Sequence, residues 1–185
     1  MKRSRTILLL ALALGLISAA CRQAPAGPAV AVEANSNQVT LGMRLKITEA
    51  GILKADLTAD TAITPAGQSN TQLRKVHLLF YEPGRPPSDL KSKTGEYDQT
   101  SGMMTARGNV VLVTKGDRAM RTITTQELFW DQRTDRVWSN VETTIVEGGQ
   151  TLIANGFNSN SAFTNVQGKN PRVKGVRVGE SGIKF

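Results

Sequence analysis

The chain has 185 residues, of which 39% are apolar and 21% are charged. These values are typical of one folded domain with a core, and they exclude a chain that is disordered throughout. The formal net charge is +8. A basic surface suits nucleic acid, lipid headgroups or phosphorylated saccharides, although a mildly basic surface is also common in proteins without an anionic partner.

The first 20 residues have the layout of a secretory signal peptide. Lys2, Arg3 and Arg5 form a basic start, and an apolar run of 11 residues follows at 7–17. A membrane-spanning helix needs about 20 apolar residues, so this run is short for a span and fits a signal peptide over residues 1–20. Export argues against a nucleic-acid partner, and removal of the three basic residues leaves a net charge of +5.

Cys21 follows three small residues, Ser18, Ala19 and Ala20, and it is the only cysteine in the sequence. This arrangement resembles the bacterial lipobox, whose cysteine is acylated through its sulfur and becomes the mature N-terminus. An exported thiol without a disulfide partner favours that role, and the alternative is an ordinary signal peptide with an incidental cysteine. We therefore expect lipid attachment at Cys21 and a flexible tether over residues 21–38.

From residue 39 onward, short runs of β-branched and aromatic residues alternate with turn sequences, and helical periodicity is absent. The predicted strands are 40–48, 53–62, 75–81, 95–98, 103–114, 120–131, 136–146 and 151–157. The predicted turns are 83–87, 115–117, 132–135 and 147–149. Many short strands with regular turns predict an all-β sandwich, barrel or roll.

A repeated pattern predicts which side chains face inward. Tyr97-Asp98 recurs as Trp130-Asp131, and an Asn-Val pair at 109–110 recurs at 140–141, which fits stacked β units or a generic hairpin repeat. Where the copies differ, a charged residue marks the outer face, because a charge is costly inside an apolar layer. The expected inner row is Tyr97, Met104, Val110, Leu112, Trp130, Val137, Val141 and Ile145. These residues line either an ordinary core or a groove for acyl chains.

Six segments, taken in order, resemble a known family. They are GILKADLTAD at 51–60, VHLLFY at 76–81, GEYD at 95–98, ARGNV at 106–110, TQELFWD at 125–131 and ANGF at 154–157. No one of them is specific, but their order and spacing are similar to those of the LptC family, the periplasmic component of lipopolysaccharide (LPS) export. That family is related to LptA and other OstA-like β-jelly-roll proteins.

The resemblance implies an all-β fold, an open V-shaped β-jelly roll of stacked antiparallel strands over residues 39–168. It implies a conduit and not an enzyme: lipid A acyl chains of LPS lie in an apolar groove, because each CH₂ group exposed to water costs about 0.8 kcal/mol. The implied partners are LPS, an inner-membrane LPS ABC transporter, and an LptA-like bridge protein that pairs with an open edge strand. Edge pairing also allows a homo-oligomer. The alternative function is an envelope scaffold lipoprotein that uses the roll only for protein contacts.

The chain departs from the family at its N-terminus. Family members often keep an uncleaved transmembrane helix, whereas this sequence offers a lipid anchor. Arg22 follows Cys21, so the aspartate that retains some lipoproteins in the inner membrane is absent. We expect a periplasmic protein anchored by lipid to a membrane, with the inner membrane favoured by the family and the outer membrane as the alternative.

Catalytic and metal-binding patterns are missing from the sequence. Its one histidine, His77, lies in a strand-like run. The sequence has no second histidine and no second cysteine that could complete a zinc site. No nucleophile elbow or phosphate-binding loop is present. We therefore expect no enzyme activity, no cofactor and no metal. The basic stretch 169–185 is expected to be a tail or a last edge strand.

Overall fold

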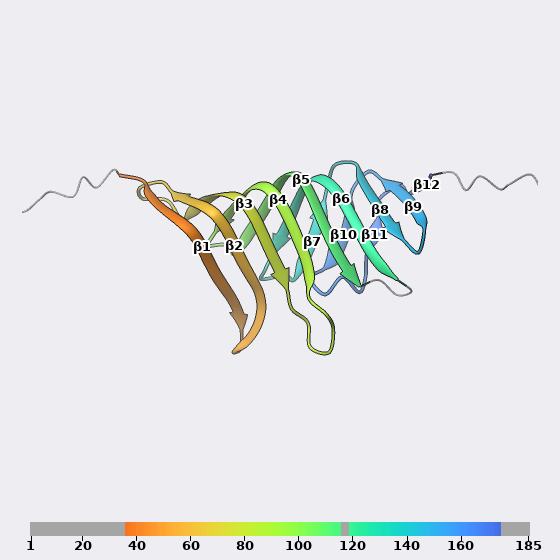
Figure 1. The fold of residues 1–185 in the computed structure, drawn as a ribbon, viewed down its shortest axis with the longest axis horizontal. Coiled ribbons are helices and arrows are strands. Elements are labelled where there is room, and N and C mark those ends of the chain that lie inside the picture. The colour runs from red at the N-terminus through yellow and green to blue at the C-terminus, as the bar shows by residue number, and fades with distance from the viewer. Residues whose placement is uncertain (1–35, 116–118, 175–185) are drawn as a thin grey trace, which may run out of the picture. The chain divides into compact units, whose positions relative to one another are not determined.

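A computed structural model describes residues 36–115 and 119–174. The expected signal peptide, the lipid-attachment residue Cys21, most of the tether and residues 175–185 lie outside the described residues. Within the described part, the chain is all-β and contains no helix (Figure 1). The all-β fold class expected from the sequence is therefore confirmed.

Twelve strands form one antiparallel sheet. Their bounds are β1 Gln38–Glu49, β2 Ile52–Thr64, β3 Asn70–Phe80, β4 Ser88–Asp98, β5 Met103–Lys115, β6 Met120–Asp131, β7 Arg136–Ser139, β8 Thr143–Glu147, β9 Gln150–Ala154, β10 Phe157–Asn160, β11 Gln167–Gly168 and β12 Arg172–Val173. Strands β1 to β6 pair in chain order, and β6 then pairs with both β7 and β8. One branch continues as β7-β10-β11 and the other as β8-β9-β12. Figure 1 shows β1 at one end of the sheet and β12 at the other.

The long strands bend near their middle, where the ladder is irregular. The register shifts once between β4 and β5 and once between β5 and β6. Lys75 and Asn109 have left-handed φ angles of 50°, and Gly108 has a φ of 76°. Bulges of this kind bend a strand and increase its twist. The two halves of the strands therefore enclose one interior, which holds a single cluster of buried apolar side chains.

The turns that follow the two copies of the repeat are built in the same way, although only the one at 132–135 was predicted. The Asp98 carboxylate accepts the Thr100 N–H at 2.8 Å, and the Asp131 carboxylate accepts the Arg133 N–H at 2.9 Å and the Thr134 hydroxyl at 2.7 Å. The hydrogen bond from the Thr100 N–H contributes most to holding the pKa of Asp98 below its usual value. For Asp131, the hydrogen bond from the Thr134 hydroxyl contributes most to lowering the pKa. The Tyr97-Asp98 and Trp130-Asp131 copies are thus equivalent strand ends.

The predicted strand at 136–146 is two strands, β7 and β8, because the chain crosses between the two branches at residues 140–142. Ser139 Oγ accepts the Val141 N–H at 3.3 Å, and Thr143 Oγ1 donates to the Val141 carbonyl at 3.0 Å. Thr125 Oγ1 donates to the Glu142 carbonyl at 3.1 Å. These buried hydroxyls replace the ladder hydrogen bonds of residues 140–142, so the segment separates β7 from β8.

Three other predicted bounds differ from the structure. β3 begins at Asn70 and not at 75, and β4 begins at Ser88 and not at 95. The predicted strand 151–157 consists of β9 and β10 with a break between them. The first half of β4 was missed because its inner face carries Ser88 and Ser92 beside Leu90, all buried, and serine gives a weak hydrophobic pattern.

Candidate functional site

One row of leucine and isoleucine side chains crosses eight strands of the inner face. Each member is the ladder partner of the next: Leu45, Leu57, Leu78, Leu90, Leu112, Ile123, Ile145 and Leu152. Neighbouring strands lie about 4.8 Å apart, so the row extends for about 34 Å. We call it the aliphatic row.

The aliphatic row is buried in its centre and accessible at its ends. Its members from β2 to β6 are no more than 1% exposed. Leu45 on β1 and Leu152 on β9 are only partly buried against the core. The interior is therefore dry in the middle and reachable from both ends of the sheet.

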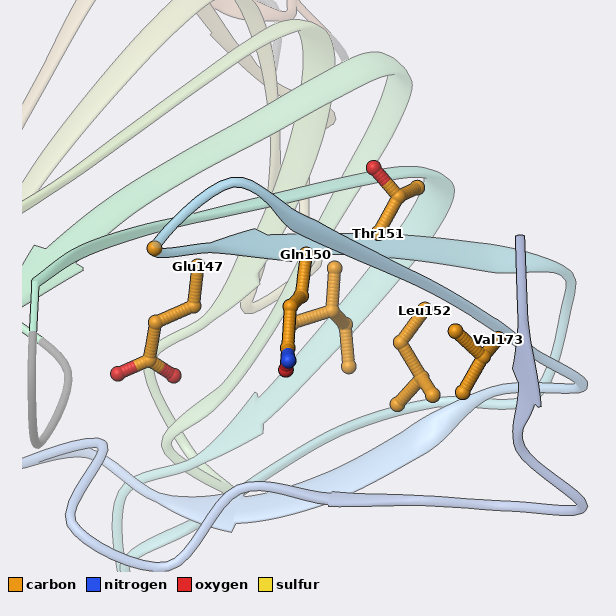
Figure 2. A pocket seen from close by; sticks show the side chains of 7 residues that line it. Glu147, Gln150, Thr151, Leu152 and Val173 are labelled. Carbon is orange, nitrogen blue, oxygen red and sulfur yellow. The ribbon is translucent and has the colours of Figure 1, made fainter. Parts of the chain in front are cut away.

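A pocket of about 420 Å³ lies at the β9 end of the row. Ile145, Leu152 and Val173 supply its apolar lining, and Glu147 and Gln150 supply polar groups. Figure 2 shows the side chains of Glu147, Gln150, Leu152 and Val173 directed into the same space. A volume of this size accommodates part of an amphiphile, with apolar and hydrogen-bonding groups available together.

A second row of side chains on the inner face is polar and lies beside the aliphatic row. We call it the polar row; its members are Ser88, Thr114, Arg121 and Glu147. Ser88 Oγ and Thr114 Oγ1 are hydrogen-bonded at 2.7 Å. The ladder partner of Thr114 is Arg121, which is 8% exposed and donates to Glu147 Oε2 from Nε at 2.8 Å and from Nη2 at 2.7 Å. A charge with such low exposure needs a partner of this kind. The rim of the interior is thus polar, and in the sequence only the two-residue spacing of Arg121 and Ile123 points to it.

Three aromatic rings pack together next to the polar row, where Phe80 is the ladder partner of Ser88. Phe80 of β3 lies edge-on to Trp130 of β6, with ring centroids 5.0 Å apart, and edge-on to Phe163, at 5.3 Å. All three side chains are at most 3% exposed. Edge-to-face rings at this distance attract one another. Phe80 and Phe163 were not among the residues predicted from the sequence.

The structure encloses seven of the eight residues of the expected inner row. Each of these has an exposure of 8% or less: Tyr97, Met104, Val110, Leu112, Trp130, Val137 and Ile145. Of these, Ile145 lines the pocket. The prediction for Val141 is wrong, because Val141 lies in the crossing segment between the branches and is 38% exposed.

The two ends of the sheet differ in their edges. β1 has 12 residues and, among the described strands, pairs only with β2. Val39 and Leu41 of β1 are 59% and 77% exposed. Arg44 holds β1 to β2 by an ion pair with Asp56 at 2.8 Å, whose hydrogen bond lowers the pKa of the Asp56 carboxyl. At the other end, β11 and β12 have two residues each.

Other chemistry is sparse in the part of the chain that the structure describes. His77 Nε2 lies 3.1 Å from an Asp89 oxygen on a partly exposed surface. Residues 36–115 and 119–174 contain no cluster of three or more His, Cys, Asp or Glu suited to a metal ion. Over the same residues, no helix is long and apolar enough to cross a membrane.

The sequence matches the family model described as "Lipopolysaccharide-assembly, LptC-related" over residues 7–167. The chain belongs to this family. The match starts within the apolar run and continues through β10, so it includes the N-terminal segment as well as the β domain. This LptC-family protein is therefore a component of LPS transport in the periplasm, and its family is one of transport components.

One similar solved structure is LptH from Pseudomonas aeruginosa, described as the LptA homologous periplasmic component of a lipopolysaccharide transport device. The two chains share 15% identity with a TM-score of 0.49, over 65% of the LptC-family chain and 92% of LptH. No curated protein matches the sequence.

Proposed function

We propose that this protein carries lipid A acyl chains of LPS through its apolar interior, between an inner-membrane ABC transporter and an LptA-like bridge protein. The observation that supports this proposal best is the aliphatic row, which continues across eight strands and is accessible at both ends. An acyl chain that leaves a membrane needs such a surface, since each CH₂ exposed to water costs about 0.8 kcal/mol.

The polar row supports a defined orientation of the lipid. Acyl chains occupy the side of the interior with the leucines, and the phosphorylated sugars lie at the rim beside Arg121, Glu147 and Gln150. Arg and amide side chains hydrogen-bond phosphate and hydroxyl groups well. The interior then matches an amphiphile from β4 to β8, where polar and apolar side chains lie side by side.

The edges of the sheet provide the proposed protein contacts. An exposed strand accepts a further strand from a neighbouring protein through main-chain hydrogen bonds. The 12-residue β1 edge and the short β12 edge lie beside the two ends of the aliphatic row, and each is proposed to pair with one partner. A strand added there extends the inner face into the next protein. The same edges also suit a homo-oligomer.

The test is photo-crosslinking in cells. A small photoreactive residue at Val110 or Ile145 is expected to give an LPS adduct, because both side chains face the interior. The same residue at Val111, Val141 or Glu142 is expected to give none, because these positions lie outside the inner face. The purified protein is probed for LPS after irradiation.

The enclosed centre of the aliphatic row favours a second candidate. A core that stays closed suits an envelope scaffold that contacts only other proteins. Adducts with proteins alone at Val110 and Ile145, in a protein shown to be folded, would support the scaffold and count against lipid transport.

The anchor is proposed to be lipid on Cys21. A Cys21→Ala variant is expected to lose incorporation of labelled palmitate and to move from the membrane fraction to the soluble fraction, since thioether-linked and amide-linked acyl chains together hold a protein on a bilayer. A variant that stays in the membrane fraction would show that lipid on Cys21 is not what holds the protein at the membrane. Density-gradient separation of inner and outer membranes then identifies the membrane that holds the protein.

A further inference from the structure

Phe163 lies in the connection between β10 and β11 and points into the interior. Its side chain is 1% exposed. Its ring contacts Phe80, which in turn contacts Trp130, so three rings from separate parts of the chain meet in one place. The Phe163 carbonyl accepts Arg121, two residues before Ile123, which stands between Leu112 and Ile145 in the aliphatic row, so the loop lies over that part of the inner face.

The backbone of Phe163 differs from that of the other two rings. Phe80 and Trp130 belong to strands, whereas Phe163 follows β10 with a left-handed φ of 54°. Large side chains rarely adopt this conformation, which is unfavourable for residues other than Gly, Asn and Asp. The native position of the ring is thus maintained by its contacts and not by its own backbone preference.

The loop that carries Phe163 is closed by its own hydrogen bonds. The Phe163 N–H donates to the Asn160 carbonyl at 3.1 Å. The Asn160 side chain accepts the Thr164 N–H at 3.0 Å and donates to the Thr164 hydroxyl at 2.8 Å. The Ser161 N–H also donates to Asp135 Oδ1 at 3.3 Å, which ties the loop to the turn before β7. Residues 161–166 form no ladder pair in the described sheet, so movement of the loop breaks side-chain contacts and leaves the ladder intact.

A short chain of contacts joins the loop to the pocket. The Phe163 carbonyl accepts Arg121 Nη1 at 3.3 Å. Arg121 is held by Glu147, and Glu147 lines the 420 Å³ pocket. A polar headgroup that binds at Glu147 or Gln150 competes for the same guanidinium that secures the loop.

We propose that Phe163 is a plug that sets how far an acyl chain can pass from the pocket into the interior. In the structure the ring is buried in the interior against Phe80; when a chain of sufficient length enters, the ring leaves and the chain takes over its contact with Phe80. The headgroup at the rim loosens the loop through Glu147 and Arg121. Phe163 is thus the residue that sets acyl-chain length selection, an inference that rests on the proposed transport function.

The test compares lipid adducts at two depths in the full-length protein in cells. A diazirine side chain close to leucine in size is placed at Leu152, in the pocket, or at Leu112, in the closed centre. The measured quantity is the ratio of the LPS adduct at Leu112 to that at Leu152. Phe163→Ala is expected to raise this ratio by at least about fourfold, the gain in affinity expected for one further buried CH₂ group.

Two further variants make the test specific. Phe129→Ala removes an aromatic ring that stacks on Trp138 outside the three-ring group, and it is expected to leave the ratio unchanged. Asn160→Ala loosens the loop without removing the ring, and it is expected to raise the ratio. The Asn160 variant retains the Phe163 ring and covers the case in which Phe163→Ala fails to fold.

The outcomes separate the plug from the transport function. Adducts at Leu152 in every background, with an unchanged ratio in the Phe163 and Asn160 variants, would overturn the plug and leave lipid transport standing. The absence of an LPS adduct at both sites, in protein that resists proteolysis, would overturn lipid transport and the plug with it.

Discussion

A Gly156→Ala variant is expected to lose about 3 kcal/mol of folding free energy or more, as the sum of backbone strain and a steric overlap. Gly156 has a φ of 114°, which alanine rarely adopts. A Cβ at this position would lie 2.3 Å from the Ser139 carbonyl oxygen and 3.2 Å from Asn140 Cα. Gly156 precedes β10, and Ser139 ends β7, so the methyl group would force apart the segments that connect the two branches.

The measurement is the urea midpoint of unfolding, followed by circular dichroism. Gly67→Ala is a matched control, because Gly67 has a φ of 71° and nothing lies within 4 Å of its Cβ position. The control is expected to cost only about 1 kcal/mol, from the left-handed backbone alone. Equal midpoints for the two variants would show that the close approach to Ser139 does not limit the fold.

A Trp130→Ala variant is expected to lose about 3–5 kcal/mol, the usual cost of removing a large buried aromatic side chain. Trp130 is 2% exposed, contacts Phe80 and lies between its ladder partners Met104 and Val137. The loss would leave a cavity beside Phe80, within the group of three rings.

Trp130→Phe is expected to differ little from the natural protein, within about 1 kcal/mol, because it removes an unsatisfied polar group together with some packing. The buried Trp130 Nε1 has no hydrogen-bond partner among residues 36–115 and 119–174. Urea unfolding of both variants gives the comparison. A phenylalanine variant as unstable as the alanine variant would mean that the indole N–H forms a hydrogen bond in solution.

The inner face was predictable where the repeat contains a charged residue. Asp98 and Asp131 end equivalent strands and point outward, so Tyr97 and Trp130, one residue earlier, are expected to point inward. The structure buries both of these aromatic side chains. The Val141 prediction used the same alignment and is wrong. The Asn-Val pair at 109–110 lies at a bulge within β5, whereas the pair at 140–141 lies where the chain leaves β7.

Neither the polar row nor the aromatic plug was predictable from local pattern. Arg121 appears in the sequence as an ordinary charged residue, and its burial depends on Glu147, which is 26 residues away along the chain. Phe163 lies in a sequence rich in Asn, Ser and Thr that is typical of an exposed loop. Such positions are determined by how distant segments pack, and one sequence contains little information about that packing.

The order of strand pairing also determines an order of assembly in time. From β1 to β6 each strand needs only the strand before it, and such local contacts form quickly. The later branches include pairings that skip strands in the chain order, β6 with β8 and β7 with β10, so both connecting segments must be in place first. We therefore expect the pocket lined by residues of β8, β9 and β12 to be completed after the sheet from β1 to β6, and an error between Ser139 and Gly156 to leave that pocket unformed.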